Sequence, residues 1–151
     1  MASIAKSALV RHRAQSMFAL VADIESYPEF LPWCAGARIL SREDGKVTAA
    51  IDIRFHGIGQ SFTTINRQVP YDRIDIQLVE GPFSQLEGGW RFTPLGVDAC
   101  KVELELEYDF NNFLLAKLIG PVFHQIATSM VESFVKRADV LADKAVGNSG
   151  S

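Results

Sequence analysis

Residues 100–109 read CKVELELEYD, and residues 113–145, which follow almost directly, read FLLAKLIGPVFHQIATSMVESFVKRADVLADKA. In the first stretch apolar and charged residues alternate, and this period of two is that of a β-strand with one dry and one wet face. In the second stretch apolar residues recur at helical spacing, and roughly 30 helical residues would span about 45 Å, enough to cross a sheet. This combination predicts an α+β domain in which one long helix covers the dry face of a sheet.

Upstream segments extend the same sheet. Alternation over residues 47–56, 73–78 and 86–92 predicts three more strands, and residues 3–11 are interpreted as a first strand. Turn residues at 44–45, 57–59, 69–72 and 94–96 link successive strands closely, which predicts an antiparallel meander. Residues 14–24 have the spacing of an amphipathic helix, and the two Pro residues at 28 and 32 predict a bent apolar elbow after it.

The sequence also indicates where the long helix begins, bends and ends. Asn111 or Asn112 is the expected N-cap, and Gly120-Pro121 predicts a kink or a restart. We expect one domain over residues 1–145 and a disordered small polar tail over residues 146–151. The predicted apolar stripe of the helix comprises Leu115, Leu118, Ile119, Val122, Ile126, Met130, Phe134, Ala138 and Leu141.

Composition excludes several classes of protein. A net charge of −3 gives no general attraction to nucleic acid, so no DNA partner is expected. Cys34 and Cys100 stand apart from each other and from any His/Cys cluster, which predicts two buried reduced thiols and no metal site. The first residues lack the features of a signal peptide, and no run of about 20 apolar residues is present, so the cytoplasm is the expected location.

A single curved sheet and a single long helix leave space between them unless large side chains fill it. The predicted inner surfaces are rich in aromatic residues, which is typical of pockets for small apolar ligands. A solid aromatic core is the alternative, and the pattern alone does not distinguish the two.

Three stretches carry a family resemblance. Residues 21–34 read VADIESYPEFLPWC, residues 81–92 read GPFSQLEGGWRF, and residues 60–62 read QSF. Together they resemble the coenzyme Q-binding protein family of the START-like polyketide cyclase/dehydrase (SRPBCC) superfamily, which also contains the bacterial ribosome association toxins. The resemblance runs from about Ser3 to Leu141 and implies a helix-grip fold, with a curved antiparallel sheet wrapped around a long C-terminal helix.

The same resemblance implies a function. The leading expectation is non-enzymatic binding of a polyprenyl quinone such as ubiquinone in an internal tunnel, in support of respiration, with no other cofactor. One alternative is a toxin of toxin–antitoxin type that blocks joining of ribosomal subunits; it would need a basic surface, for which the candidates are Lys6, Arg11, Arg13, Lys136, Arg137 and Lys144. A cyclase-type enzyme is a further alternative, disfavoured because no acid, base and nucleophile set is recognisable.

No catalytic or metal-binding residue is predicted. Residues 113–123 are apolar on almost every side, which suggests transient contact with a membrane, at the inner membrane surface of a bacterium, during ligand exchange. Glu29, Glu87 and Arg91 are candidates for contacting a ligand head group. The predicted ligand-binding residues are Tyr27, Phe30, Leu31, Trp33, Phe55, Phe62, Phe83, Leu86, Trp90, Phe92, Leu115, Ile119, Val122, Phe123, Ile126 and Met130.

Overall fold

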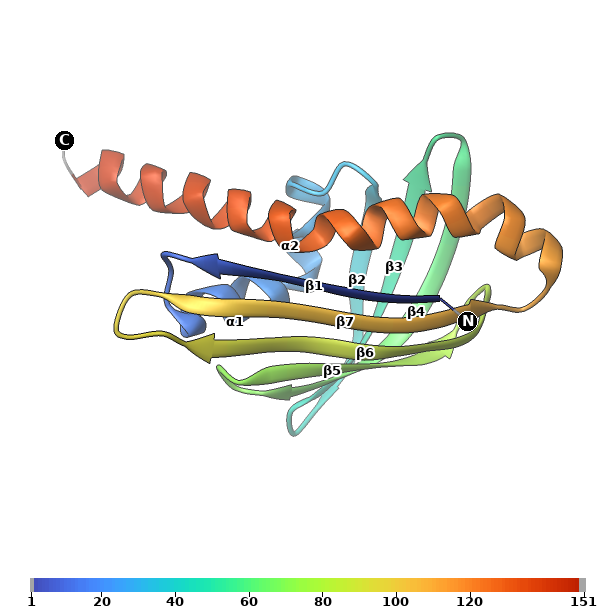
Figure 1. Ribbon diagram of the computed structural model, residues 1–151, viewed down its shortest axis with the longest axis horizontal. Coiled ribbons are helices and arrows are strands. Elements are labelled where there is room, and N and C mark those ends of the chain that lie inside the picture. Colours follow the sequence, from blue (N-terminus) through green and yellow to red (C-terminus); the bar gives the residue numbers. More distant parts are fainter. Residues whose placement is uncertain (1, 150–151) are drawn as a thin grey trace.

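The computed structural model describes residues 2–149, and in Figure 1 a curved sheet runs beneath one long helix. The seven strands form one antiparallel sheet in the order β1-β7-β6-β5-β4-β3-β2. The α+β prediction is therefore confirmed. The elements are β1 (Ala2–Val10), α1 (Ala14–Ala22), the 3₁₀ helix η1 (Ile24–Glu29), β2 (Cys34–Glu43), β3 (Lys46–Phe55), β4 (Ile58–Val69), β5 (Arg73–Glu80), β6 (Phe83–Pro94), β7 (Cys100–Phe110) and α2 (Phe113–Ser149).

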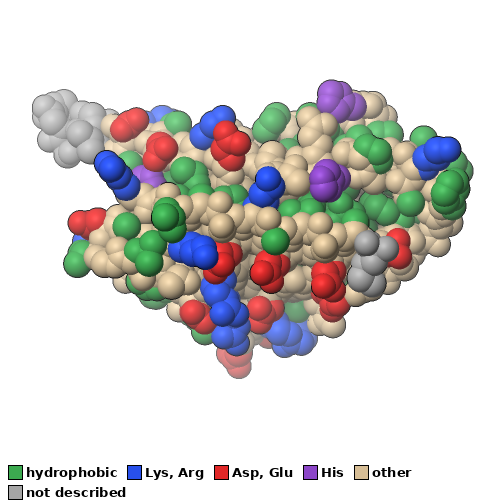
Figure 2. Space-filling view, viewed as in Figure 1, with side chains coloured by type: hydrophobic (Ala, Val, Ile, Leu, Met, Phe, Trp, Pro, Cys, Tyr) green, Lys and Arg blue, Asp and Glu red, His purple; other side chains and the backbone are tan. Residues whose placement is uncertain are grey.

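The two faces of β7 are divided as the alternation predicts. Cys100, Val102, Leu104, Leu106 and Tyr108 are all buried, and the acidic residues between them lie on the outer face. A row of acidic side chains is visible on the outer surface of the sheet in Figure 2. Because β7 pairs with β1 on one side and β6 on the other, it anchors the sheet beneath α2.

Strand β2 and most of β4 were not predicted, and one turn lies earlier than predicted. β2 pairs with β3, but its register shifts twice, between Cys34 and Gly36 and between Ile39 and Ser41, so its residues do not alternate in a simple way. The β3–β4 hairpin turns at His56 and Gly57, both with positive φ, one residue earlier than the turn residues suggested. Positive φ at both central residues is typical of a type I′ hairpin turn.

Two adjacent glycines allow the sheet to curve closely. A Cβ atom on Gly88 would lie 2.0 Å from the carbonyl oxygen of Glu105, and one on Gly89 would lie 2.3 Å from that of Ile74. Gly88 also has φ of +145°, a region that other residues rarely adopt. This pair in β6 therefore permits the close backbone approach that its place within a strand predicts.

The elbow after α1 is bent, as predicted, but it contains a 3₁₀ helix with Pro28 inside it. Proline removes a single N–H donor, which this short 3₁₀ helix of six residues tolerates. The Tyr27 hydroxyl donates a hydrogen bond to the Val21 carbonyl, 2.5 Å away, and the amides of Phe30 and Leu31 donate to the Tyr27 carbonyl. These bonds fix the elbow beside the sheet.

Helix α2 begins at a cap formed by Asn112, whose side-chain oxygen accepts a hydrogen bond from the Leu115 amide at 2.9 Å. The helix continues through Pro121, and its first turns bend away from the remaining axis in Figure 1. It extends to Ser149, past the end near residue 145 that the sequence suggested, while residues 150–151 of the expected tail lie outside the described residues.

The apolar stripe of α2 is mostly placed as predicted. Ile119, Ile126, Phe134 and Ala138 are buried, but Leu118 is 54% exposed, so its assignment to the stripe is wrong. Its side chain lies on the outward face of the first turns. By length and composition residues 113–145 would be able to span a membrane, yet the most buried apolar residues of this helix cover the sheet.

Candidate functional site

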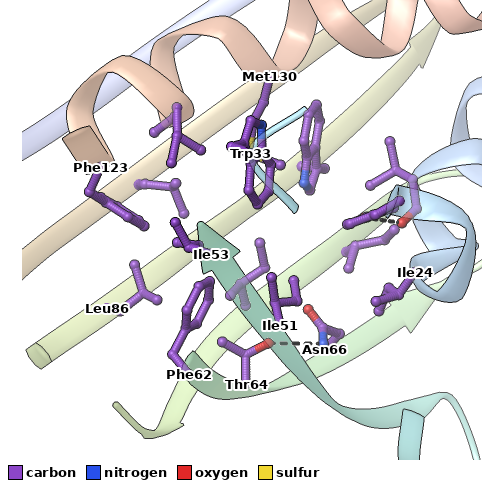
Figure 3. A pocket seen from close by; sticks show the side chains of 18 of the residues that line it. Ile24, Trp33, Ile51, Ile53, Phe62, Thr64, Asn66, Leu86, Phe123 and Met130 are labelled. Atoms are coloured by element: carbon purple, nitrogen blue, oxygen red, sulfur yellow. Dashed lines mark hydrogen bonds between the residues drawn. The ribbon is translucent and has the colours of Figure 1, made fainter. Parts of the chain in front are cut away.

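An apolar cavity of about 70 Å³ lies between the inner face of the sheet and α2. In Figure 3, Met130 and Phe123 extend from α2 toward side chains from the strands, and Trp33 lies beside Met130. Room for about five water-sized groups follows from this volume. The cavity is lined by Val21, Ile24, Tyr27, Trp33, Ile51, Ile53, Phe62, Thr64, Asn66, Gln68, Ile74, Ile76, Leu86, Trp90, Leu106, Phe123, Ile126, Ala127 and Met130.

Five strands, the elbow and α2 each supply part of this lining. The strand residues belong to the inward-facing sets of β3 to β7, because alternation sends every second side chain to the concave face. Residues Phe123, Ile126, Ala127 and Met130 occupy one face of α2, at the three- and four-residue spacing of a helix. Leu118 and the charged residues of α2 are outside this face.

Aromatic side chains fill the space at one end of the cavity. We call this set the first aromatic cluster: Phe62, Phe83, Tyr108, Phe110 and Phe123. The Phe83 ring centroid lies 4.9 Å from that of Phe123 and 5.7 Å from that of Phe62, in edge-to-face geometry. Such pairs are favourable beyond the burial of their area. Phe62 and Phe123 line the cavity, and Phe83 packs behind them.

A second aromatic cluster lies at the other end and consists of Tyr27, Phe30, Trp90, Phe92 and Phe134. Phe134 is fully buried and contacts Tyr27, Phe30 and Trp90 at centroid distances of 5.3 Å. Arg137 stacks over Phe30 at 5.1 Å and forms an ion pair with Glu29 at 3.3 Å. Because an aromatic cluster closes each end, the structure has a short cavity in place of the expected tunnel.

Three polar side chains of β4 interrupt the apolar lining: Thr64, Asn66 and Gln68. The Asn66 amide nitrogen donates to the Val47 carbonyl at 3.3 Å and to the Thr64 hydroxyl oxygen at 3.1 Å. Figure 3 shows the hydrogen bond that joins Thr64 and Asn66. The indole N–H of Trp33, a residue only 4% exposed, has no hydrogen-bond partner among the described residues.

No Asp, Glu, Lys, Arg or His side chain lines the cavity within residues 2–149. Tyr27 is its one titratable residue; burial raises the pKa of its hydroxyl far above the ordinary value, and that hydroxyl already donates to Val21. Burial likewise raises the pKa of the neighbouring Cys34 thiol to about 11. The cavity therefore offers apolar contact and neutral hydrogen-bonding groups rather than a base or a nucleophile.

Half of the predicted ligand-binding residues line the cavity, and the others lie around it. Phe83 and Phe92 are buried in the aromatic clusters behind the lining, and Leu31 is buried beneath the elbow. Phe55 is displaced from the cavity because it lies at the β3–β4 turn, where its ring is 4.1 Å from that of His56. The predicted residues in the lining are Tyr27, Trp33, Phe62, Leu86, Trp90, Phe123, Ile126 and Met130; those outside it are Phe30, Leu31, Phe55, Phe83, Phe92, Leu115, Ile119 and Val122.

Leu115 and Ile119 are outside the cavity because they belong to the first turns of α2, before the helix reaches it. Val122 is next to the lining residue Phe123 but points to a different side of the helix. The charged candidates for a head-group contact are also outside. Arg91 is exposed, and the Glu87 carboxylate accepts a hydrogen bond from Gln85 at 2.7 Å. Strand alternation turns both side chains to the outer face of β6.

Sequence reasoning missed the polar lining residues and several aliphatic ones. Thr64, Asn66 and Gln68 continue the every-second-residue series that begins at Phe62, so the period of two could have found them. Because they are polar, these residues were expected on the solvent-facing side of the sheet. The missed residues are Val21, Ile24, Ile51, Ile53, Thr64, Asn66, Gln68, Ile74, Ile76, Leu106 and Ala127.

Outside the cavity, titratable groups are dispersed. No group of three His, Cys, Asp or Glu residues that could hold a metal ion is found within the described part of the chain. Cys34 and Cys100 are both buried and free, as predicted. His12 pairs with Asp139 at 2.6 Å, which ties the loop before α1 to α2, and His124 lies 3.3 Å from the Tyr108 hydroxyl.

Several known proteins are similar in sequence to most of this chain. The chain is 46% identical to the "persistence and stress-resistance toxin PasT" of Escherichia coli O6:H1 and 45% identical to the "ribosome association toxin RatA" of Escherichia coli K12, in each case over 91% of this chain and 87% of the relative. It is 27% identical to the mitochondrial "coenzyme Q-binding protein COQ10 homolog B" of Xenopus laevis, over 82% of this chain and 52% of that protein.

Solved structures agree with the fold. The 18 kDa protein CC1736 of Caulobacter crescentus has a TM-score of 0.75 at 32% identity, over 95% of this chain and 99% of that one. The Zhui aromatase/cyclase of Streptomyces has a TM-score of 0.82 at 14% identity, over 91% and 93%, and supports the fold alone. The helix-grip, START-like expectation is confirmed. Residues 10–135 match the family described as "Polyketide cyclase / dehydrase and lipid transport", and the chain belongs to this family.

Proposed function

We propose that this protein binds a hydrophobic ligand in the cavity between its sheet and α2. The observation that carries the proposal is the lining itself, which is apolar and aromatic and, within the described residues, contains no charged side chain. Small-molecule pockets have this character, with a few polar groups that fix the orientation of the ligand. The family description, which includes lipid transport, supports the same conclusion.

An isoprenoid quinone is our proposed ligand class, supported by the relative named as a coenzyme Q-binding protein. The cavity has room for about five water-sized groups, roughly one five-carbon prenyl unit. Burying such a unit is worth about 4 kcal/mol at ~0.8 kcal/mol per carbon, too little by itself to offset the cost of association. A quinone therefore has to separate the sheet and α2, and Met130, with its flexible side chain, is the residue we expect to move first.

We propose that binding occurs without chemistry. The cavity has neither a free carboxylate nor an imidazole in its described lining, and the raised pKa of the nearby Cys34 thiol disfavours the thiolate. An enzymatic function is the alternative, because a protein of the same fold is named as an aromatase/cyclase. That protein shares only 14% identity with this chain, so it gives little support for enzymatic activity here.

Action on ribosomal subunit association is a second candidate function, favoured by relatives of that name at up to 45% identity. A role at ribosomes would place the protein in the cytoplasm. Of the six basic residues expected to form the contact, three are already paired with acids. Arg13 pairs with Asp98, Lys136 with Glu132, and Arg137 with Glu29. Lys6, Arg11 and Lys144 form no ion pair with the described residues and carry this proposal.

The start of α2 is the surface we propose for contact with a membrane. Phe113 is 78% exposed, Leu114 64% and Leu118 54%, and Lys117 lies over the Phe113 ring at 5.6 Å. Apolar side chains and a basic side chain gather at the right end of the molecule in Figure 2, where α2 begins in Figure 1. Flotation with anionic liposomes tests this contact. Binding that Leu114→Asp abolishes supports it, and absence of wild-type binding contradicts it.

One preparation tests the two main functions together. Protein purified from its native host is extracted with organic solvent for lipid mass spectrometry, and the same protein is added to dissociated ribosomal subunits for sucrose-gradient analysis. A stoichiometric isoprenoid lipid supports ligand binding. A lower fraction of joined subunits, restored by Arg11→Glu but not by the control Arg42→Glu on exposed β2, supports ribosome action. An empty protein without effect on subunits contradicts both proposals.

A further inference from the structure

The polar residues of β4 form a distinct region of the cavity, which we call the polar strip: Thr64, Asn66 and Gln68. Thr64 is 4% exposed and Asn66 is 6% exposed, so both side chains are effectively removed from bulk water. Buried polar groups normally have hydrogen-bond partners, and any group left without one requires an explanation.

The hydrogen bonds of Asn66 leave one of its atoms unused. Its Nδ2 atom donates to the Val47 carbonyl and to Thr64 Oγ1. A carbonyl cannot donate, so the Val47 bond fixes the orientation of the amide, and the atom without a partner among residues 2–149 is the acceptor Oδ1. Because Thr64 Oγ1 accepts from Asn66, its own proton is available, and no acceptor for it is found among the described residues.

Trp33 supplies an independent observation. Its Nε1–H is buried and without a partner within the described part of the chain, although the residue lines the same cavity. In Figure 3 Trp33 lies on the α2 side of the cavity, beside Met130, and the bonded Thr64 and Asn66 lie on the β4 side. The cavity thus contains two unused donors and one unused acceptor, all from neutral side chains.

A charged ligand group has no counter-charge at this site. Asp, Glu, Lys, Arg and His are all missing from the cavity lining within residues 2–149. An ionised carboxylate or phosphate moved into such a place loses its hydration and gains no ion pair, which is strongly unfavourable. A hydroxyl or carbonyl oxygen loses less hydration and finds the unused donors and acceptor in exchange.

We infer that the cavity selects a neutral amphipathic ligand, whose hydroxyl or carbonyl oxygen binds the polar strip and whose apolar chain lies toward the first aromatic cluster. This inference rests on the proposed ligand-binding function and adds the polarity of the ligand and the side chains that bind its oxygen. Fatty acids and phospholipids are excluded as preferred ligands, while isoprenoid alcohols and ring ketones belong to the favoured class.

Tryptophan fluorescence provides a direct readout because the chain has two tryptophans, and both Trp33 and Trp90 line the cavity. The probes share one eight-carbon chain, which, like a quinone, has to separate the sheet and α2 to enter, and they differ at its end: 1-octanol, octanoate at pH 7.5, and n-octane. Octanoate is ionised at this pH. We expect 1-octanol to bind at least tenfold more tightly than octanoate.

The variants separate the polar strip from general packing. Thr64→Val replaces the hydroxyl by a methyl group of similar size, and we expect it to weaken 1-octanol binding about fivefold while leaving n-octane unchanged. Thr63→Val is the matched control, because Thr63 is also buried in β4 but does not line the cavity. Asn66→Leu, checked for folding by circular dichroism, should weaken 1-octanol in the same way.

The outcomes distinguish this inference from the function on which it rests. If none of the three probes changes the fluorescence, the proposed ligand binding and this inference both fail. If octanoate binds as tightly as 1-octanol, or if Thr64→Val weakens n-octane equally, ligand binding stands and selection of a neutral polar group is overturned.

Discussion

Enlarging one alanine of the cavity should stabilise the protein, whereas enlarging another on the same helix should not. Ala127 is 1% exposed and lines the cavity; Ala138 is similarly buried but packs in the core outside it. Ala127→Leu adds three carbon atoms to a space of about 70 Å³, which has room for about five water-sized groups. We therefore expect the added side chain to fit without displacing its neighbours.

The magnitude follows from the added carbons. Three buried carbons at ~0.8 kcal/mol each contribute about 2.4 kcal/mol, and fixing the leucine rotamer costs about 0.5–1 kcal/mol. The free energy of unfolding should rise by about 1.5–2 kcal/mol, which for this chain length raises Tm by roughly 3–8 °C. Ala138→Leu inserts the same atoms where space is filled and should lower the free energy of unfolding by about 1–3 kcal/mol.

Thermal and urea unfolding of both variants, followed by circular dichroism, provide the assay. Ala127→Leu should also weaken binding of 1-octanol at least tenfold, because leucine occupies the space of the ligand. If Ala127→Leu destabilises the protein as much as Ala138→Leu does, the space beneath α2 is not available to an added side chain, and the reasoning is refuted.

Three further predictions concern the groups that shape and surround the cavity. Gly88→Ala should prevent stable folding, because its Cβ would lie 2.0 Å from the Glu105 carbonyl oxygen, whereas Gly57→Ala, also at positive φ but with nothing within 4 Å, should cost about 1 kcal/mol in urea unfolding; equal costs would argue against close approach. Tyr27→Phe removes the donor to a buried carbonyl and should lower the unfolding free energy by about 1–3 kcal/mol; an unchanged midpoint would contradict this role. With its pKa raised to about 11, Cys34 should be about 0.1% thiolate at pH 8 and should react with iodoacetamide far more slowly in the folded than in the urea-unfolded protein, and more rapidly as pH rises toward 11; similar rates in both states would refute burial of the thiol.

The parts of the fold that follow a single strong period could be predicted from sequence. The alternation of β7 and the helical spacing of α2 both specify a buried face, and Ile126 and Phe134 lie on it. β2 was missed because its two register shifts interrupt the alternation. Leu118 was misplaced because the first turns of α2 bend from the remaining helix axis, and periodicity alone does not show which face such turns bury.

The candidate site was predicted less completely, for a different reason. Aromatic residues such as Trp33 and Phe123 are conspicuous in the sequence, and both line the cavity. Whether an aromatic residue lines a cavity or packs behind its wall depends on its neighbours in three dimensions, which is why Phe83 and Phe92 could not be distinguished from them. Asn66 was missed because a polar residue on a strand is normally assigned to the wet face.

Ligand-to-protein nuclear Overhauser effects test the central claim, that an apolar ligand occupies the space between the sheet and α2. With a perdeuterated protein in which Trp and Met are protonated, bound 1-octanol should show effects to the indole protons of Trp33 and Trp90 and to the Met130 methyl group. Effects confined to the Met17 methyl group, which is buried outside the cavity lining, or no effects at saturating ligand, would contradict the account.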